Sequence, residues 1–280
     1  MKTLVFGNTG QVATELQHHV DVTALDRAAA DLCDPAACAA AIKAHEPDVV
    51  INAAAYTAVD RAEDEPELAQ IINADAPGAM AQACADLDIP FLHLSTDYVF
   101  DGSGTAPWSV NDPIAPLGVY GRTKAAGEDA VRAAGGAHAI IRTSWVFSAH
   151  GANFVKTMLR LSETRDALNV VDDQIGGPTP ASGIADTLMI MAQAMVAGQS
   201  GGTYHYAGAP TVSWACFARE TFSAAGRTVT VTGIPTSEYP TPATRPLNSR
   251  LDCSLLETEF GITPPDWKSD LAKITSEILA

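Results

Sequence analysis

Positively charged residues are scarce in this sequence, and so are long apolar runs. Its 280 residues hold 17 Lys and Arg against 33 Asp and Glu, a net charge of −16 at pH 7. Nucleic acid and anionic membrane surfaces bind to clustered Lys and Arg, so we expect no nucleic-acid partner and no membrane partner. The apolar stretch at residues 184–197 is interrupted by Asp186 and Gln193. It is also shorter than the roughly 20 residues of a membrane-spanning helix.

Export signals and paired cysteines are missing as well. The apolar run before Gly7 is far shorter than the roughly 7–15-residue core of a signal peptide. The five cysteines are scattered and form neither a Cys-x-x-Cys pair nor a Cys/His spacing of the zinc type. We therefore expect a cytoplasmic protein with reduced thiols.

Apolar runs alternate with alanine-rich, helix-length segments through the first half of the chain. Hydrophobic residues make up 47% of the sequence and charged residues 18%, as in an ordinary globular protein. Nearly continuous apolar strands bounded by breakers are typical of parallel strands covered on both faces. The expected strands are Thr3–Phe6, Val22–Leu25, Val49–Asn52, Phe91–Ser95 and Ala139–Thr143, and the expected helices lie near 11–19, 35–45, 66–87 and 119–134. This alternation predicts a doubly wound α/β fold, a Rossmann-type parallel sheet.

The alternation of strands and helices becomes less regular after about residue 148. Helices are expected near 153–165, 180–197 and 214–225, and the four prolines in Pro235–Pro246 predict an extended or looped segment. We therefore expect a nucleotide-binding domain at 1–148, completed by parts of 165–200. Residues 149–280 are expected to form mainly a smaller substrate-binding region.

A glycine-rich turn, Gly7-Asn8-Thr9-Gly10-Gln11-Val12-Ala13, follows the first expected strand. The usual spacing Gly-x-Gly-x-x-Gly is absent, and the third glycine is replaced by Ala13. Glycines there let a pyrophosphate approach the start of the helix, and alanine is still small enough for close helix–strand packing. A tight turn without a ligand has the same pattern, but its place at the first strand–helix junction favours a dinucleotide.

The ends of the second and third expected strands carry further cofactor candidates. Asp26 favours NAD through the adenosine ribose hydroxyls, whereas Arg27 is suited to the extra phosphate of NADP, so the preference stays open. Asp31 and Leu32 are placed to flank the adenine, although Asp31 is explained equally well as a helix cap. The small residues in Asn52–Thr57 would let a flat cofactor pass close to the backbone.

Tyr120 and Lys124 form the sharpest chemical signal. Residues four apart share one face of a helix, so the phenol and the ammonium can serve a single site. A nearby ammonium and an oxidised nicotinamide would lower the tyrosine pKa from roughly 10. The fourth strand ends in Ser95–Phe100, which adds hydroxyls that can orient a carbonyl group. A hydroxyl, a tyrosine and a lysine together favour hydride transfer to a carbonyl.

These motifs resemble the extended short-chain dehydrogenase/reductases. More narrowly, four later segments are similar to those of the dTDP-4-dehydrorhamnose reductases. They are Arg142–Phe147, Asn153–Leu159, Asp172–Thr179 and Arg245–Leu251. The resemblance covers nearly the whole chain.

The resemblance implies the last step of dTDP-L-rhamnose synthesis. In that step NADPH or NADH gives hydride to C4 of the keto-sugar, and Tyr120 protonates the oxygen. The catalytic positions it implies are Thr96, Tyr120 and Lys124. The cofactor positions are Gly7, Gly10, Gln11, Val12, Asp26, Asp31, Leu32, Ala55, Tyr56, Thr57, Tyr120 and Lys124. The substrate positions are Val59, Thr96, Asp97, Trp145 and Arg245.

Three questions stay open at this point. Some relatives form homodimers that hold Mg²⁺ through glutamates, and Glu15 matches one such position. The other positions cannot be matched, so a homodimer remains an alternative and we predict no metal site.

Two alternative functions also stay open. Another nucleotide-sugar reductase or epimerase shares the cofactor site, and a non-catalytic NADP-binding regulatory subunit shares the fold. The set of Thr96, Tyr120 and Lys124 argues against the regulatory subunit.

Overall fold

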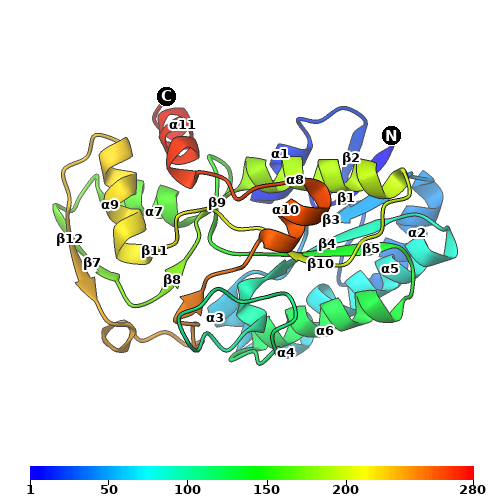
Figure 1. Cartoon of the computed structure of the whole chain (residues 1–280), viewed down its shortest axis with the longest axis horizontal. Coiled ribbons are helices and arrows are strands. Elements are labelled where there is room, and N and C mark those ends of the chain that lie inside the picture. Colours follow the sequence, from blue (N-terminus) through cyan, green and yellow to red (C-terminus); the bar gives the residue numbers. More distant parts are fainter.

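A parallel six-stranded sheet forms the centre of the molecule (Figure 1). The computed structural model describes all 280 residues. The strand order is β10-β5-β4-β3-β1-β2, and every neighbouring pair is parallel. The strands are β1 (Thr3–Phe6), β2 (Val22–Leu25), β3 (Val49–Asn52), β4 (Phe91–Thr96), β5 (His138–Thr143) and β10 (Thr203–His205). The predicted doubly wound fold is confirmed, whereas β10 was not expected.

Helices cover both faces of this sheet. Successive strand residues point to opposite faces, so Val5 packs with α1 and α8 while Leu4 and Phe6 pack with α2 and α5. The helices are α1 (Gln11–Leu16), α8 (Ala181–Val196), α2 (Pro35–His45), α5 (Ala76–Asp86) and α6 (Val119–Ala133). Although α8 lies late in the chain, it packs against α1 and shares the core of the sheet.

The helix expected at 66–87 is broken in the structure. It consists of α4 (Pro66–Gln70), one π-helical turn (Ile71–Asp75) and α5. Pro77 has no amide hydrogen to give to the carbonyl of Asn73, which explains the widened turn before α5. The turn directs the Asn73 side chain to Tyr56, whose backbone N–H donates to its Oδ1 at 2.8 Å.

The remaining elements lie around the sheet, most of them at the left of Figure 1, whereas residues 254–260 lie near β10 and residues 59–62 near α6. They are α3 (Val59–Ala62), β6 (Val146–Phe147), α7 (Phe154–Leu161), β7 (Ala167–Val171), β8 (Ile175–Gly176), β9 (Thr179–Pro180), β11 (Val212–Ser213), α9 (Trp214–Ala224), β12 (Thr230–Ile234), β13 (Asn248–Ser249), α10 (Ser254–Phe260) and α11 (Trp267–Leu279). Phe147, Phe217 and Trp267 join α7, α9 and α11 in one apolar cluster. The helices α3, α10 and α11 were not expected, and neither were the strands outside the central sheet.

The proline-rich segment is a loop, as predicted, apart from one 3₁₀ turn at Thr236–Glu238. None of the helices combines the length and the apolar character needed to cross a membrane.

Candidate active site

A cavity of about 830 Å³ opens beside the carboxyl ends of the strands. It is the position where doubly wound sheets bind nucleotides. Nearly all of the predicted cofactor positions line it: Gly7, Gly10, Gln11, Val12, Asp26, Asp31, Leu32, Ala55, Thr57, Tyr120 and Lys124. Tyr56 does not, and its phenol instead donates to Glu65 Oε2 at 2.6 Å.

The glycine-rich turn has the backbone shape that its sequence requires. Gly7 has a φ of +106°, a conformation that L side chains rarely adopt. A Cβ on Gly7 would lie 3.4 Å from the Cβ atoms of Ala13 and Ala54, an ordinary contact distance, so the backbone conformation and not the space favours glycine here. Ala13 is fully buried, so a small residue is needed at the third position of the motif.

Gln11 ties this turn to the second half of the chain. Its Oε1 accepts hydrogen bonds from Ser148 Oγ at 2.9 Å and from Asn153 Nδ2 at 3.0 Å. Asn153 also caps α7 by accepting from the backbone N–H of Lys156 at 3.0 Å. The start of α1 and the start of α7 are therefore held together at one edge of the cavity.

The charged residues after β2 make local hydrogen bonds. Arg27 Nε donates to Asp31 Oδ2 at 3.1 Å, while Asp26 Oδ1 accepts from the backbone N–H of Ala29 at 2.9 Å. Hydrogen bonds from the Cys33 backbone and from Arg27 hold the pKa of Asp31 below its ordinary value. Both Asp26 and Arg27 line the cavity. The residue that favours NAD and the residue that favours NADP therefore face the same cavity.

Tyr120 and Lys124 lie on the first two turns of α6 and face the same cavity. Burial raises the pKa of Tyr120 to about 12, although a hydrogen bond with Thr96 opposes the rise. We expected Lys124 to lower this pKa. Instead, the Lys124 Nζ donates to the carbonyl of Leu94 at 2.6 Å and lies 3.2 Å from His93 Nε2. The phenol therefore keeps its proton at neutral pH.

Thr96 and Asp97 stand beside this tyrosine at the end of β4. Thr96 Oγ1 donates to Asp97 Oδ1 at 3.1 Å and accepts from the backbone N–H of Tyr98 at 3.2 Å. Burial raises the pKa of Asp97 to about 6. Its Oδ2 is buried and makes no well-formed hydrogen bond within the chain, although the hydroxyl of Ser249 lies near enough to the carboxyl to oppose the rise in pKa. A buried polar atom without a partner is costly, which is typical of a group that awaits a ligand.

The predicted substrate residues fall into two groups. Val59 begins α3, and the next residue, Asp60, binds the guanidinium of Arg245. The indole of Trp145, in the second group, is stacked on Trp214 at a ring-centre distance of 3.6 Å. Trp145 has a φ of +51°, so its backbone is held in a conformation unusual for a large residue.

The chain is similar to known proteins over nearly its whole length. The family profile described as RmlD substrate binding domain matches residues 1–279. A dTDP-4-dehydrorhamnose reductase of Sinorhizobium fredii is 44% identical over 290 residues, which cover 100% of this chain and 98% of the relative. The chain belongs to the dTDP-4-dehydrorhamnose reductase family.

Solved structures of the dTDP-4-dehydrorhamnose reductase family have the same fold. The enzyme of Clostridium acetobutylicum superimposes with a TM-score of 0.93 at 36% identity and covers 100% of both chains. The enzyme of Bacillus anthracis, solved in complex with NADP, gives a TM-score of 0.92 at 33% identity and covers 99% of this chain and 100% of its own.

Several residues around this candidate site were missed by the sequence analysis. Glu128 is fully buried one helical turn after Lys124 and accepts from Arg142 Nη2 at 2.6 Å and from Ser95 Oγ at 2.5 Å. Its position four residues after Lys124 was a usable signal, since it repeats the Tyr120–Lys124 spacing. His93 adjoins Lys124 and Asn52 adjoins His93, but only the register of β3 against β4 brings Asn52 and His93 together.

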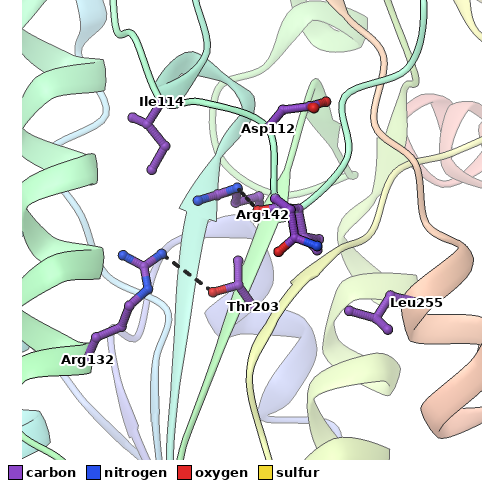
Figure 2. Close-up of a pocket in the computed structure, with 8 residues that line it drawn as sticks. Asp112, Ile114, Arg132, Arg142, Thr203 and Leu255 are labelled. Atoms are coloured by element: carbon purple, nitrogen blue, oxygen red, sulfur yellow. Dashed lines mark hydrogen bonds between the residues drawn. The ribbon is translucent and has the colours of Figure 1, made fainter.

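A second cavity of about 420 Å³ lies near α6, and Figure 2 shows Arg132, Arg142 and Thr203 around it. None of the predicted site residues lines it. The structure holds no cluster of three or more His, Cys, Asp or Glu residues with the geometry of a metal site.

Proposed function

We propose that this protein reduces the C4 keto group of dTDP-4-dehydro-L-rhamnose to give dTDP-L-rhamnose. The observation that carries the proposal is that Tyr120 and Lys124 line one cavity together with the glycine-rich turn. The relatives that share this chain's length are reductases of that name. A bound NADPH or NADH supplies the hydride.

Tyr120 supplies the proton in this proposal. The ketone gains a hydride at C4 and a proton at oxygen, so the phenol becomes a phenolate and then regains a proton from solvent. Thr96, which hydrogen-bonds Tyr120, orients the carbonyl oxygen beside the phenol. Lys124 in its ammonium form holds the nicotinamide ribose and favours the transient phenolate by its charge.

The cofactor is assigned to the large cavity. The left-handed Gly7 leaves space for a pyrophosphate close to the backbone, and Asp26 and Arg27 face the adenosine end. Residues 1–148 with α8 form this cofactor half in our proposal, and residues 149–280 otherwise serve mainly the substrate. Tyr56 keeps its assignment through its backbone, because its phenol is bound to Glu65.

The dTDP-sugar is assigned to the residues around Asp97 and Arg245. The unpartnered Oδ2 of Asp97 accepts from a sugar hydroxyl, and the guanidinium of Arg245 faces the diphosphate. Trp145 and Val59 cover the apolar faces of the substrate. We also propose a cytoplasmic location, since all five cysteines are free thiols.

The test is the loss of absorbance at 340 nm from NADH and from NADPH with enzymatically generated dTDP-4-dehydrorhamnose. Substrate-dependent oxidation that yields dTDP-L-rhamnose supports the proposal and ranks the two cofactors. A folded protein that binds a cofactor but oxidises neither one would contradict it. That result would favour another keto-sugar or a regulatory subunit.

A further inference from the structure

A chain of buried polar side chains lies behind Lys124. The Nζ of Lys124 is 3.2 Å from Nε2 of His93, and Nδ1 of the same imidazole is 3.2 Å from Nδ2 of Asn52. Asn52 and His93 are fully buried, and Lys124 is 2% exposed. Asn52 and His93 are also register partners on β3 and β4, so the sheet itself fixes their spacing.

The backbone determines which way the Asn52 amide points. Its Oδ1 accepts from the backbone N–H of Ala54 at 3.1 Å, which leaves the NH₂ group facing His93 Nδ1. That nitrogen must then be the acceptor. Burial and the neighbouring Lys124 keep the pKa of His93 well below its ordinary value, so the ring is neutral and carries one hydrogen. The hydrogen is therefore on Nε2, directed at Lys124.

An N–H directed at an ammonium would set a donor against a donor. An uncharged amine can accept this hydrogen bond while still donating to the carbonyl of Leu94. The charged ammonium instead needs the His93 hydrogen on Nδ1 and the Asn52 amide turned over. The N–H of Ala54 then loses its acceptor. The amide pairing thus favours the uncharged amine.

The other groups near the amine are few. Burial lowers the pKa of Lys124 to about 8, and the only charged group that opposes this is Glu128 on the same helix. Glu128 is itself neutralised by Arg142 of β5 and by Arg132. From the π-helical turn, the neutral side chain of Asn73 reaches α6 at Thr123. Tyr120, on α6, keeps its proton at these pH values.

We propose that His93, oriented by Asn52, is a positioning residue that couples its own tautomer to the charge of Lys124. When Lys124 releases a proton to solvent, the His93 hydrogen moves from Nδ1 to Nε2 and the Asn52 amide turns. The inference rests on the proposed function only for its effect on turnover, because the ammonium is the form that holds the cofactor ribose. The fall of activity at alkaline pH then reports the same loss of the Lys124 proton.

The test is an NMR titration of the full-length protein labelled with ¹⁵N-histidine. Long-range ¹H–¹⁵N correlation distinguishes protonated from unprotonated ring nitrogens. We expect the His93 hydrogen on Nδ1 below the Lys124 titration and on Nε2 above it, without His93 itself becoming charged. One unchanged tautomer across this range would overturn the proposal. The measurement needs no substrate, so it stands whether or not the protein reduces the sugar.

Asn52→Asp provides the matching variant. One carboxylate oxygen still accepts from Ala54, and the other accepts from His93 Nδ1–H, so Nε2 becomes a permanent acceptor for the ammonium. We expect the Nδ1–H tautomer at every pH. The alkaline limb of kcat/KM should move upward by about one to two pH units. An unmoved limb in Asn52→Asp would count against the coupling.

His205→Asn is the control, because His205 is another fully buried histidine of the same sheet. Its Nδ1 lies 3.0 Å from the carbonyl of Trp108, and it does not bond to Lys124. In His205→Asn we expect the alkaline limb of kcat/KM to stay at the pH where the unsubstituted protein has it. A limb that moves as far in His205→Asn as in Asn52→Asp would assign the shift to general loosening of the sheet and overturn the proposal.

Discussion

The guanidinium of Arg245 forms a bidentate salt bridge with the carboxylate of Asp60, with Nη2 2.7 Å from Oδ2 and Nη1 3.0 Å from Oδ1. The two residues are 185 positions apart in the sequence. The pair fastens the proline-rich loop to α3. It also places a cation close to Tyr98, whose ring packs edge-on against Tyr120 at 5.4 Å.

Arg245→Ala is expected to raise the KM for the dTDP-sugar by about tenfold to a hundredfold, the effect of losing one or more charge-assisted hydrogen bonds. The Kd of NADPH should hardly change, since Arg245 does not line the cofactor cavity. Steady-state kinetics and a fluorescence titration measure the two constants. Arg219→Ala on α9 removes an exposed positive charge elsewhere and should leave KM unchanged. Equal effects of both variants would remove Arg245 from the substrate site.

Tyr120→Phe is expected to reduce kcat by about a hundredfold to ten-thousandfold, because it removes the proton donor and keeps the ring. Cofactor binding should persist. Tyr98→Phe is the matched control, because it deletes the hydroxyl of the adjacent ring and should cost far less. Single-turnover measurements of NADPH oxidation separate the chemical step from product release. Turnover retained in Tyr120→Phe would refute the assigned donor.

The buried carboxyl of Asp97 should make stability depend on pH. Its pKa rises from 3.8 to about 6 in the folded protein, so the folded state binds a proton more tightly than the unfolded chain. Its stabilising contribution is complete below pH 3.8 and is lost as the pH rises to about 6, which amounts to about 3 kcal/mol. Asp97→Asn should therefore be more stable at pH 7 than the unchanged protein, while it binds the sugar more weakly.

Denaturant unfolding at pH 4 and pH 7 measures this difference. The stability gap between Asp97→Asn and the unchanged protein should widen with pH, since the other titrating groups are common to both. A stability gap that stays constant from pH 4 to pH 7 would show that burial does not raise the pKa of the Asp97 carboxyl.

Glu128→Gln should destabilise the fold by about 3–5 kcal/mol, because it leaves the buried Arg142 without a countercharge. Both carboxylate oxygens of Glu128 bind Arg142, at 2.8 Å and 2.6 Å, next to the cavity of Figure 2. Arg142→Met should cost a similar amount. A double variant is expected to cost much less than the sum, and a double-mutant cycle by thermal unfolding measures the coupling. Simple additivity would mean that the two residues act independently.

The sequence predicted five adjoining strands of the central sheet, whereas β10 and the short strands outside that sheet were missed. Buried parallel strands such as Val49–Asn52 are short, nearly continuous apolar runs bounded by breakers, a local pattern that the sequence shows directly. β10 was missed because Thr203–His205 is short and polar and becomes a strand only by pairing with β5. The broken helix at 66–86 depends on Pro77 and on packing against α6, which single-sequence periodicity does not describe.

The same distinction holds for the site. Tyr120 and Lys124 were predictable because one helix sets their spacing, and the glycine-rich turn because it is local. The pairing of Arg245 with Asp60 joins distant segments, so no local pattern connects the two residues. The neutral surroundings of Lys124 likewise follow from strand register, which brings His93 and Asn52 together.

The hydrogen bonds of Gln11 also bear on how the chain acquires its shape during synthesis. The glycine-rich turn leaves the ribosome first, yet Ser148 and Asn153, which hold Gln11, emerge much later. The helix that covers α1 is later still, since α8 ends at Val196. A nascent chain that ends near residue 148 therefore exposes one apolar face of its sheet. Cofactor affinity should appear only after two-thirds of the polypeptide has been made.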